Sequence, residues 1–252
     1  MKKIDRGRGA LLAAQFSFMP NRLGLCGPDA NEVMLGHLVD RHADRELEEV
    51  LRGFHGAYPY LHFIAYASGI RDPFDPRVTE AYWIGNELLE SVSMDDFHVH
   101  LRERFERRFP PKLLDALLGH VPAGAHAHHN FHVLAMPLRT GHQEVPHTLA
   151  TMDACRVSWG RVQAVVGDDL LVERRPLVLR DGALALGDPQ TQVVKWRFGG
   201  KAFCQPRPGD AVAIHWGCAC QRLSERQLRH LVRETRRHLG IANARKANVV
   251  FR

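Results

Sequence analysis

One histidine near the C-terminus stands inside an apolar run, in a pattern that could hold a ligand. Residues 211–219, AVAIHWGCA, follow the turn-forming letters PGD, so we expect a strand whose side chains alternate between two faces. Val212, Ile214 and Trp216 share one face, which predicts a core. Small residues surround His215 on the other face and leave room beside its ring. The alternative is a structural histidine held by hydrogen bonds.

Histidines form a second candidate site in the segment HAHHNFHVLAMP. His126, His128 and His132 would converge on a metal if the chain turns suitably, and His129 would share a helix face with His132. The spacing lacks a His-Glu-x-x-His pattern with its built-in general base, so it does not by itself imply catalysis. The alternative is a polar loop that leads into a strand.

Cysteines supply the remaining candidate ligands. Cys26 lies between glycines, just before a helix expected to begin at Asp29, and a helix N-terminus lowers the pKa of a nearby thiol. It is therefore predicted to be a reactive thiolate or a further metal ligand, or else a buried turn cysteine. Cys218 and Cys220 are expected to face away from His215, as small buried hydrophobes, if the strand continues that far.

Composition indicates a globular protein of the cytoplasm. Lys and Arg outnumber Asp and Glu by 34 to 28, but the charges are mixed along the chain and basic-aromatic interleaving is not evident, so nucleic-acid binding is not expected.

The 5 cysteines are an odd number, and Met1 is followed by charge rather than by the apolar region of a signal peptide, which favours free thiols in a reducing compartment. The apolar stretches are too short to span a membrane.

The first half of the chain has helical periodicity. Asp75 before a proline is a helix start, and apolar residues then recur at helical spacing as far as Val92. The segment FHVLAMPL predicts a short strand that ends at Pro137. The expected helices cover residues 30–40, 44–68, 76–92, 95–108 and 111–119.

The second half is predicted to be a small barrel closed by a helix. Short β-like runs alternate with turns at Gly167, Gly182 and Gly199, which argues for five strands. Ser224 with a glutamine three residues later is a capping box that begins a helix expected to stop at Gly240. The predicted class is α+β: a helical domain over 1–148, of unknown function, and an OB-like β-barrel with a C-terminal helix over 149–252.

Two blocks in this second half resemble the hydrogenase-maturation chaperones of the HypC/HybG type. CRVSWGRVQAVVGDDLLV begins at Cys155 and is similar to the family's block of a cysteine followed by Pro-Gly and a strand. PGDAVAIHWGCACQRLSERQLRHLVRETRRHL is similar to its Pro-Gly-Asp-x-Val-x-x-His-x-Gly-x-Ala block and trailing helix. The cysteine of the family follows the initiator Met, whereas Cys155 is internal, and Trp159 occupies the position of the family's proline.

The resemblance implies a function in metal-cofactor assembly. Cys155 and His215 match the residues that hold an Fe(CN)2(CO) fragment and pass it to the large-subunit precursor of a nickel-iron hydrogenase, with a HypD-like scaffold as second partner. Thiolate is a soft anionic ligand and imidazole is a good ligand for iron. The sequence thus predicts a non-enzymatic chaperone with a transient iron cargo and no organic cofactor. The rivals are a metal-dependent enzyme built on the His126–His132 cluster and a nucleic-acid-binding barrel.

Overall fold

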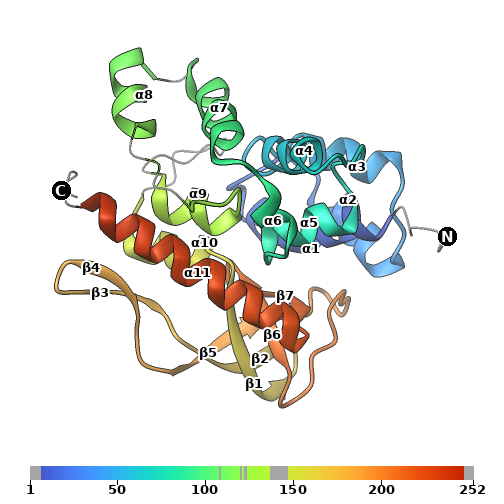
Figure 1. Ribbon diagram of the computed structural model, residues 1–252. Coiled ribbons are helices and arrows are strands. Elements are labelled where there is room, and N and C mark those ends of the chain that lie inside the picture. Colours follow the sequence, from blue (N-terminus) through green and yellow to red (C-terminus); the bar gives the residue numbers. More distant parts are fainter. Residues whose placement is uncertain (1–6, 108, 120, 122–123, 137–146, 247–252) are drawn as a thin grey trace.

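A computed structural model of the chain describes residues 7–107, 109–119, 121, 124–136 and 147–246 (Figure 1). The helices are α1 (Arg8–Arg22), α2 (Asn31–Asp40), α3 (Arg45–Arg52), α4 (Tyr58–Ala67), α5 (Pro76–Trp83), α6 (Leu88–Ser91), α7 (Met94–Phe105), α8 (Pro111–Leu118), α9 (His129–Ala135), α10 (Leu149–Cys155) and α11 (Glu225–Lys246). The strands are β1 (Ser158–Val166), β2 (Asp169–Arg174), β3 (Leu177–Arg180), β4 (Ala183–Leu186), β5 (Gln190–Lys195), β6 (Ala211–His215) and β7 (Cys218–Arg222).

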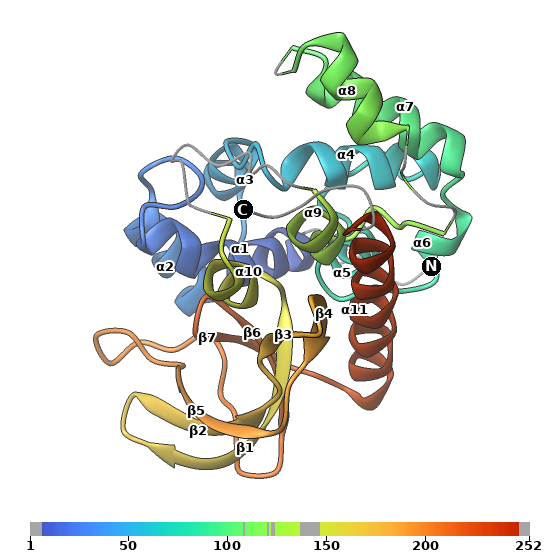
Figure 2. The ribbon, with the colours of Figure 1, turned by 90° about the vertical axis from the view of Figure 1, so that its left-hand side faces the viewer.

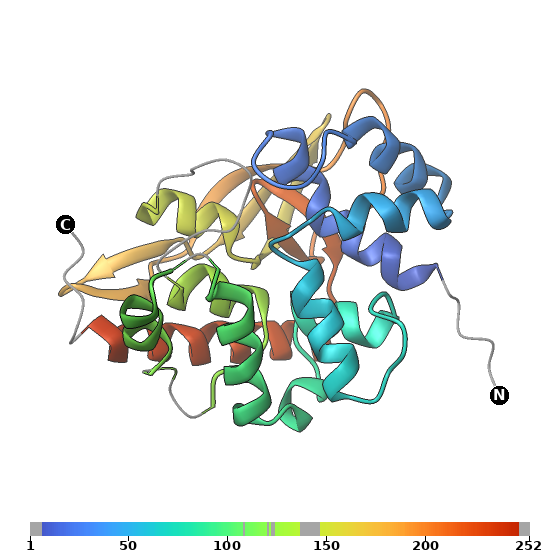
Figure 3. The ribbon, with the colours of Figure 1, turned by 90° about the horizontal axis from the view of Figure 1, so that it is seen from above.

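The helices gather on one side of the molecule and the strands on the other (Figures 1 and 2). Five strands close a barrel in the order β1-β2-β5-β7-β6, in which β5 and β7 are parallel and the other pairs are antiparallel. β3 and β4 form a separate hairpin. Viewed from above, the start of α1 and the end of α11 lie at opposite ends of the molecule (Figure 3). The predicted α+β class, with a small barrel and a closing helix, is confirmed.

One hydrophobic core extends across both halves. Phe16 and Phe18 of α1 belong to the same buried cluster as Ala213 of β6 and Cys218 of β7. A smaller cluster fills the barrel itself, around Val172 and its neighbours. Because burial of each large apolar side chain contributes about 1.5–3 kcal/mol, this joint core holds the barrel firmly against the helices. Any site between the helices and the barrel is therefore lined by residues of the helical half.

A fully buried asparagine joins three elements at this junction. The Asn130 side chain accepts from the Val157 backbone N–H (2.8 Å) and donates to the Val157 carbonyl (3.0 Å) and to the Thr235 hydroxyl (3.0 Å). It thereby links α9 to the segment before β1 and to α11. The buried backbone groups of Val157 depend on this amide, since water does not reach them.

The strand that carries His215 ends at that residue, earlier than predicted. Trp216 (φ 51°) and Gly217 (φ 70°) form a tight turn, and β7 then pairs with β6 so that Cys218 lies opposite His215. The expectation that Cys218 and Cys220 face away from His215 is wrong, because the turn returns the chain on the same face. Both cysteines are buried against the helices.

Several predicted boundaries also differ from the structure. The helix expected over 44–68 is two helices that break at Gly53, and the one expected over 76–92 ends at Trp83, before Gly85 adopts φ 97°. The first five residues of FHVLAMPL, 131–135, belong to the helix α9 rather than to a strand, and Pro137 lies outside the described residues. The capping box of Ser224 and Gln227 is confirmed, but α11 continues through Gly240 because Ile241 and Ala242 pack against the protein. α1 and α10 were not predicted.

The sequence predicts no membrane-spanning segment, and the helices of the structure can be compared with that prediction. Among the helices described, none combines the length and the apolar character that crossing a bilayer requires.

Loss of the Asn130 amide should destabilise the protein strongly. Asn130→Ala leaves a buried N–H and a buried carbonyl of Val157 without partners, so we expect the free energy of unfolding to fall by about 2–4 kcal/mol in urea titrations. Asn243→Ala is the matched control, because Asn243 makes the same pair of bonds to the backbone of Leu184 (2.8 and 2.9 Å) but is half-buried, where water can replace it. Equal losses in the two variants would contradict the role given to burial.

Candidate metal centre

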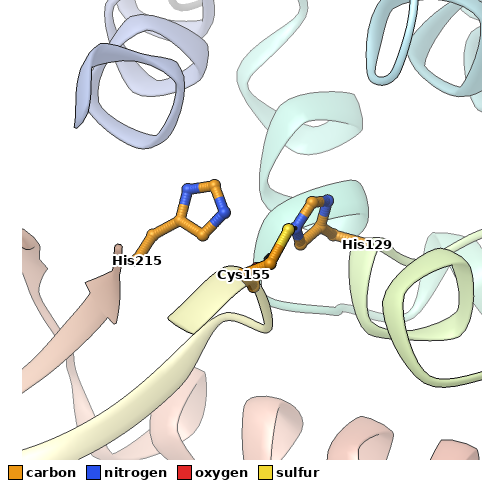
Figure 4. A group of neighbouring side chains, drawn as sticks. All are labelled: His129, Cys155 and His215. Carbon is orange, nitrogen blue, oxygen red and sulfur yellow. Dashed lines mark hydrogen bonds between the residues drawn. The ribbon is translucent and has the colours of Figure 1, made fainter. Parts of the chain in front are cut away.

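Three donor side chains meet where the helices face the barrel. They are His129, the first residue of α9, Cys155, the last residue of α10, and His215, the last residue of β6. One donor atom of each lies within 4.8 Å of the other two. Figure 4 shows the His215 ring reaching from the end of the strand towards Cys155 and His129. Each side chain stands at an element terminus, so the site depends on where three elements end.

The spacing of the donors suits one shared metal ion. Cys155 Sγ lies 4.0 Å from His129 Nε2. A metal held tetrahedrally at about 2.3 Å from sulfur and about 2.0 Å from nitrogen separates these atoms by about 3.5 Å. Closing the remaining gap takes only a small side-chain rotation. Two imidazoles and one thiolate are ligands that zinc and iron both accept.

His215 is held in one orientation from its far side. Its Nδ1–H donates to the carbonyl oxygen of Phe16 in α1, at 2.7 Å, and the residue is 2% exposed. This bond assigns the proton to Nδ1, so Nε2 carries the lone pair that a metal needs. Trp83 packs at 5.6 Å between ring centroids and limits the ring's rotation.

Both ring nitrogens of His129 make hydrogen-bond contacts. The Tyr82 hydroxyl lies 3.2 Å from Nδ1, and Nε2 lies 2.8 Å from the Cys155 carbonyl oxygen. Burial, and next the neighbouring His215, hold its pKa well below the usual value, so the ring is neutral. A carbonyl oxygen can only accept, so the 2.8 Å contact assigns the proton to Nε2, and Nδ1 accepts from the Tyr82 hydroxyl. To bind a metal through Nε2, the ring would have to release the Cys155 carbonyl and take the tautomer protonated on Nδ1, for which the Tyr82 oxygen can serve as acceptor.

Cys26 lies close enough to Cys155 for the two thiols to influence each other. Burial raises its pKa to about 11, and the charge of Cys155 adds to that increase. The raised pKa is opposite to the lowering that a helix start predicts, because α2 begins only at Asn31 and loss of water outweighs any helix effect. Asn21 anchors this turn by donating to the Cys26 carbonyl, at 3.0 Å. Cys26 stands beside the trio as a protonated thiol.

The other predicted histidine ligands lie elsewhere. His128 caps α9 by accepting from the Asn130 N–H, and His132 Nδ1 lies 3.3 Å from the Tyr60 hydroxyl. His126 Nδ1–H donates to Glu234 of α11, at 2.8 Å. Within the described residues, none of these three belongs to a group of donors spaced to share an ion. The cluster contributes His129 instead, which its sequence spacing did not single out.

Comparison with known proteins identifies the family. Residues 5–249 match a family described as a family of unknown function (DUF6390). The chain belongs to the DUF6390 family. No curated protein and no solved structure matches it.

Glu234 should make the fold sensitive to acid. Burial acts to raise its pKa, but the hydrogen bond from His126 and the electrostatic attraction of His128, His126 and His238 as they protonate in acid outweigh burial and lower the pKa from 4.5 to about 2. A lowered pKa means that the carboxylate stabilises the protein above pH 4.5 and loses this effect as the pH falls towards 2, a contribution of about 3 kcal/mol. We expect Glu234→Gln to lower the free energy of unfolding at pH 7 and to flatten its decline below pH 4.5, in urea titrations.

The control for this prediction is Glu87→Gln. Glu87 also pairs with a histidine of α11, His230 at 3.2 Å, but its side chain is 69% exposed. Solvent screening makes such a pair contribute little. A pH profile unchanged by Glu234→Gln would refute the assignment.

The trio should bind a divalent transition metal through sulfur. We expect Co2+ titration of the purified protein to produce a near-ultraviolet thiolate-to-cobalt band, and Cys155→Ala to abolish it. Loss of a residue that only orients a metal ligand weakens metal binding by about 10- to 100-fold. Because His215 is itself a ligand in this site, His215→Ala should weaken Co2+ binding by more than that. Cys204→Ala removes a buried thiol outside the trio and should leave the band intact. A band that survives Cys155→Ala would exclude this site.

Proposed function

We propose that this protein is a maturation chaperone that carries an Fe(CN)2(CO) fragment on Cys155 and His215 and delivers it to the large-subunit precursor of a nickel-iron hydrogenase. The observation that carries the proposal is the convergence of these two side chains. The resemblance of two separate sequence blocks singles them out independently of any geometry, and they lie in one three-donor group. A chance resemblance of two separate blocks gives no reason for these two side chains to meet.

The barrel supports the same proposal. Counted within the barrel alone, its third and fifth strands, β5 and β7, pair in parallel, while all other neighbours are antiparallel. We take this order as that of an OB-like barrel, the architecture that the resemblance implies. α11 follows the last barrel strand directly, as the trailing helix of the chaperone block does.

The donor set suits an iron fragment that already carries strong ligands. Cyanide and carbon monoxide would occupy three positions on iron, and the protein needs to supply only a few more. A thiolate and a neutral imidazole bind such iron without demanding a closed cage. In this proposal His129 is either a third ligand or the donor that orients Cys155, according to the tautomer that Tyr82 supports.

The helical half has a defined part in the proposed activity. Phe16 orients His215, while Trp83 lies 5.6 Å from the His215 ring and 4.6 Å from the His129 ring. In this proposal these helical residues would shield an iron held by Cys155 and His215 from water on the side of the helices. Cys155 is the half-buried member of the trio, so exchange with a HypD-like scaffold or the hydrogenase precursor takes place on its side. The hydrogenase precursor and the scaffold are partners by proposal.

The rival function is a metal-dependent enzyme built on the His126–His132 cluster. Among the described residues, His126, His128 and His132 belong to no group of donors spaced to share an ion, and each makes a hydrogen-bond contact elsewhere. Nor does any contact among these residues favour a nucleic-acid-binding barrel. The chaperone is therefore the one function proposed.

Infrared spectroscopy tests the proposal. The protein is purified after expression together with the hydrogenase-maturation machinery, and we expect stretching bands of iron-bound cyanide and carbon monoxide. Cys155→Ala should remove the bands, whereas Cys204→Ala should retain them. Zinc without these bands in the wild-type protein, under expression that loads a known chaperone, would overturn the proposal.

A further inference from the structure

A cavity of 500 Å³ opens between the start of α11, the helices α1 and α5, and residues Phe203 and Gln221 of the strand half. Its lining includes the apolar side chains of Leu11 and Leu12 from α1, Leu38 from α2 and Phe203. The volume falls in the range of about 300–1,000 Å³ that small-molecule sites occupy. None of the metal-centre trio lines this cavity, so a ligand bound there is independent of the proposed chaperone function.

Arginines dominate the polar part of the lining. Arg8, Arg41, Arg77 and Arg226 line the cavity, and Glu80 is the one acidic residue among the described residues of the lining. Two of the four are already neutralised: Arg77 pairs with Asp75 at 2.8 Å, and Arg226 pairs with Glu80 at 2.6 Å and with Glu87 at 3.2 Å.

The other two arginines, Arg8 and Arg41, are exposed at the rim of the cavity. Within the part of the chain that the structure describes, neither makes an ion pair or a side-chain hydrogen bond. Arg41 follows α2 with φ 52°, a left-handed conformation that favours glycine or asparagine. The fold therefore holds an arginine at a position where its side chain adds strain, and that side chain lines the cavity.

Two guanidinium groups over an apolar floor select an anion of particular chemistry. A phosphate monoester carries up to two charges and three acceptor oxygens, which match two arginine forks. The side chains of Gln15 and Gln221 add amide donors to the lining. Phe203 and the leucines then accommodate an apolar or aromatic body. We propose that this pocket binds a small phosphate monoester whose organic part is apolar or aromatic.

Calorimetric titration with three probes tests the proposal: phenyl phosphate, inorganic phosphate and phenol. We expect phenyl phosphate to bind best, with inorganic phosphate and phenol each weaker by about tenfold or more, because each lacks one half of the match. Arg8→Gln combined with Arg41→Gln should weaken phenyl phosphate by about tenfold or more. The control combines Arg45→Gln and Arg180→Gln, which removes the same charge outside the pocket and should have little effect.

Three outcomes would overturn the proposal. Equal affinity for inorganic and phenyl phosphate would indicate a plain anion site. Equal weakening in both double variants would indicate nonspecific attraction to a basic protein, and the absence of binding at millimolar phenyl phosphate would exclude the pocket. Thermal unfolding of each variant checks that the fold is retained. Leu12→Gln alters the apolar floor alone and should weaken phenyl phosphate more than inorganic phosphate.

Discussion

The hydrogen bond from the His215 ring to the Phe16 carbonyl determines how the two halves of this protein work together. It joins residues 199 positions apart and spans the boundary between the barrel and α1. The bond satisfies a buried backbone carbonyl, selects one tautomer and aims the opposite nitrogen at Cys155. Without α1, nothing would fix the tautomer or the ring orientation of a histidine at the end of β6. The helical half is thus part of the site.

The polar groups around the trio form a second layer with a structural purpose. Asn130 fixes the start of β1 relative to α9, and Tyr82 fixes the ring of His129. Asp153 accepts from Arg156 and Arg174 at 3.0 and 2.6 Å, and from the backbone N–H of Leu177, the first residue of β3, at 2.8 Å. These bonds position the end of α10, where Cys155 lies, from both sides. A donor set at three element termini needs such support, because termini otherwise fray.

Much of the barrel could be predicted from the sequence, since strands with glycine turns are encoded locally. The caps at Asp75 and Ser224 are confirmed for the same reason. The helix α9 reads as a strand in the sequence because all seven of its residues are buried, so it shows no amphipathic period. The faces of Cys218 and Cys220 could not be assigned correctly because Trp216, a bulky residue, takes the left-handed turn position.

Two of the three donors of the candidate site could be predicted from the sequence. Cys155 and His215 could be named from paired blocks, yet His129 depends on contacts between distant segments, and no local pattern separates it from its histidine neighbours. Cys26 illustrates the opposite error: the local rule suggested a lowered pKa, and burial reversed it. What sequence reasoning lacks at such positions is the tertiary environment that sets burial.

The three donors come from segments centred on residues 129, 155 and 215, and the last of them is anchored on α1. During synthesis the N-terminal helices, α9 and α10 leave the ribosome well before β6. A nascent chain therefore presents Cys155 and His129 without their barrel partner, and the three-donor group forms only when β6 docks on α1. The three side chains can act together only in a chain that has been made as far as β6 and has folded.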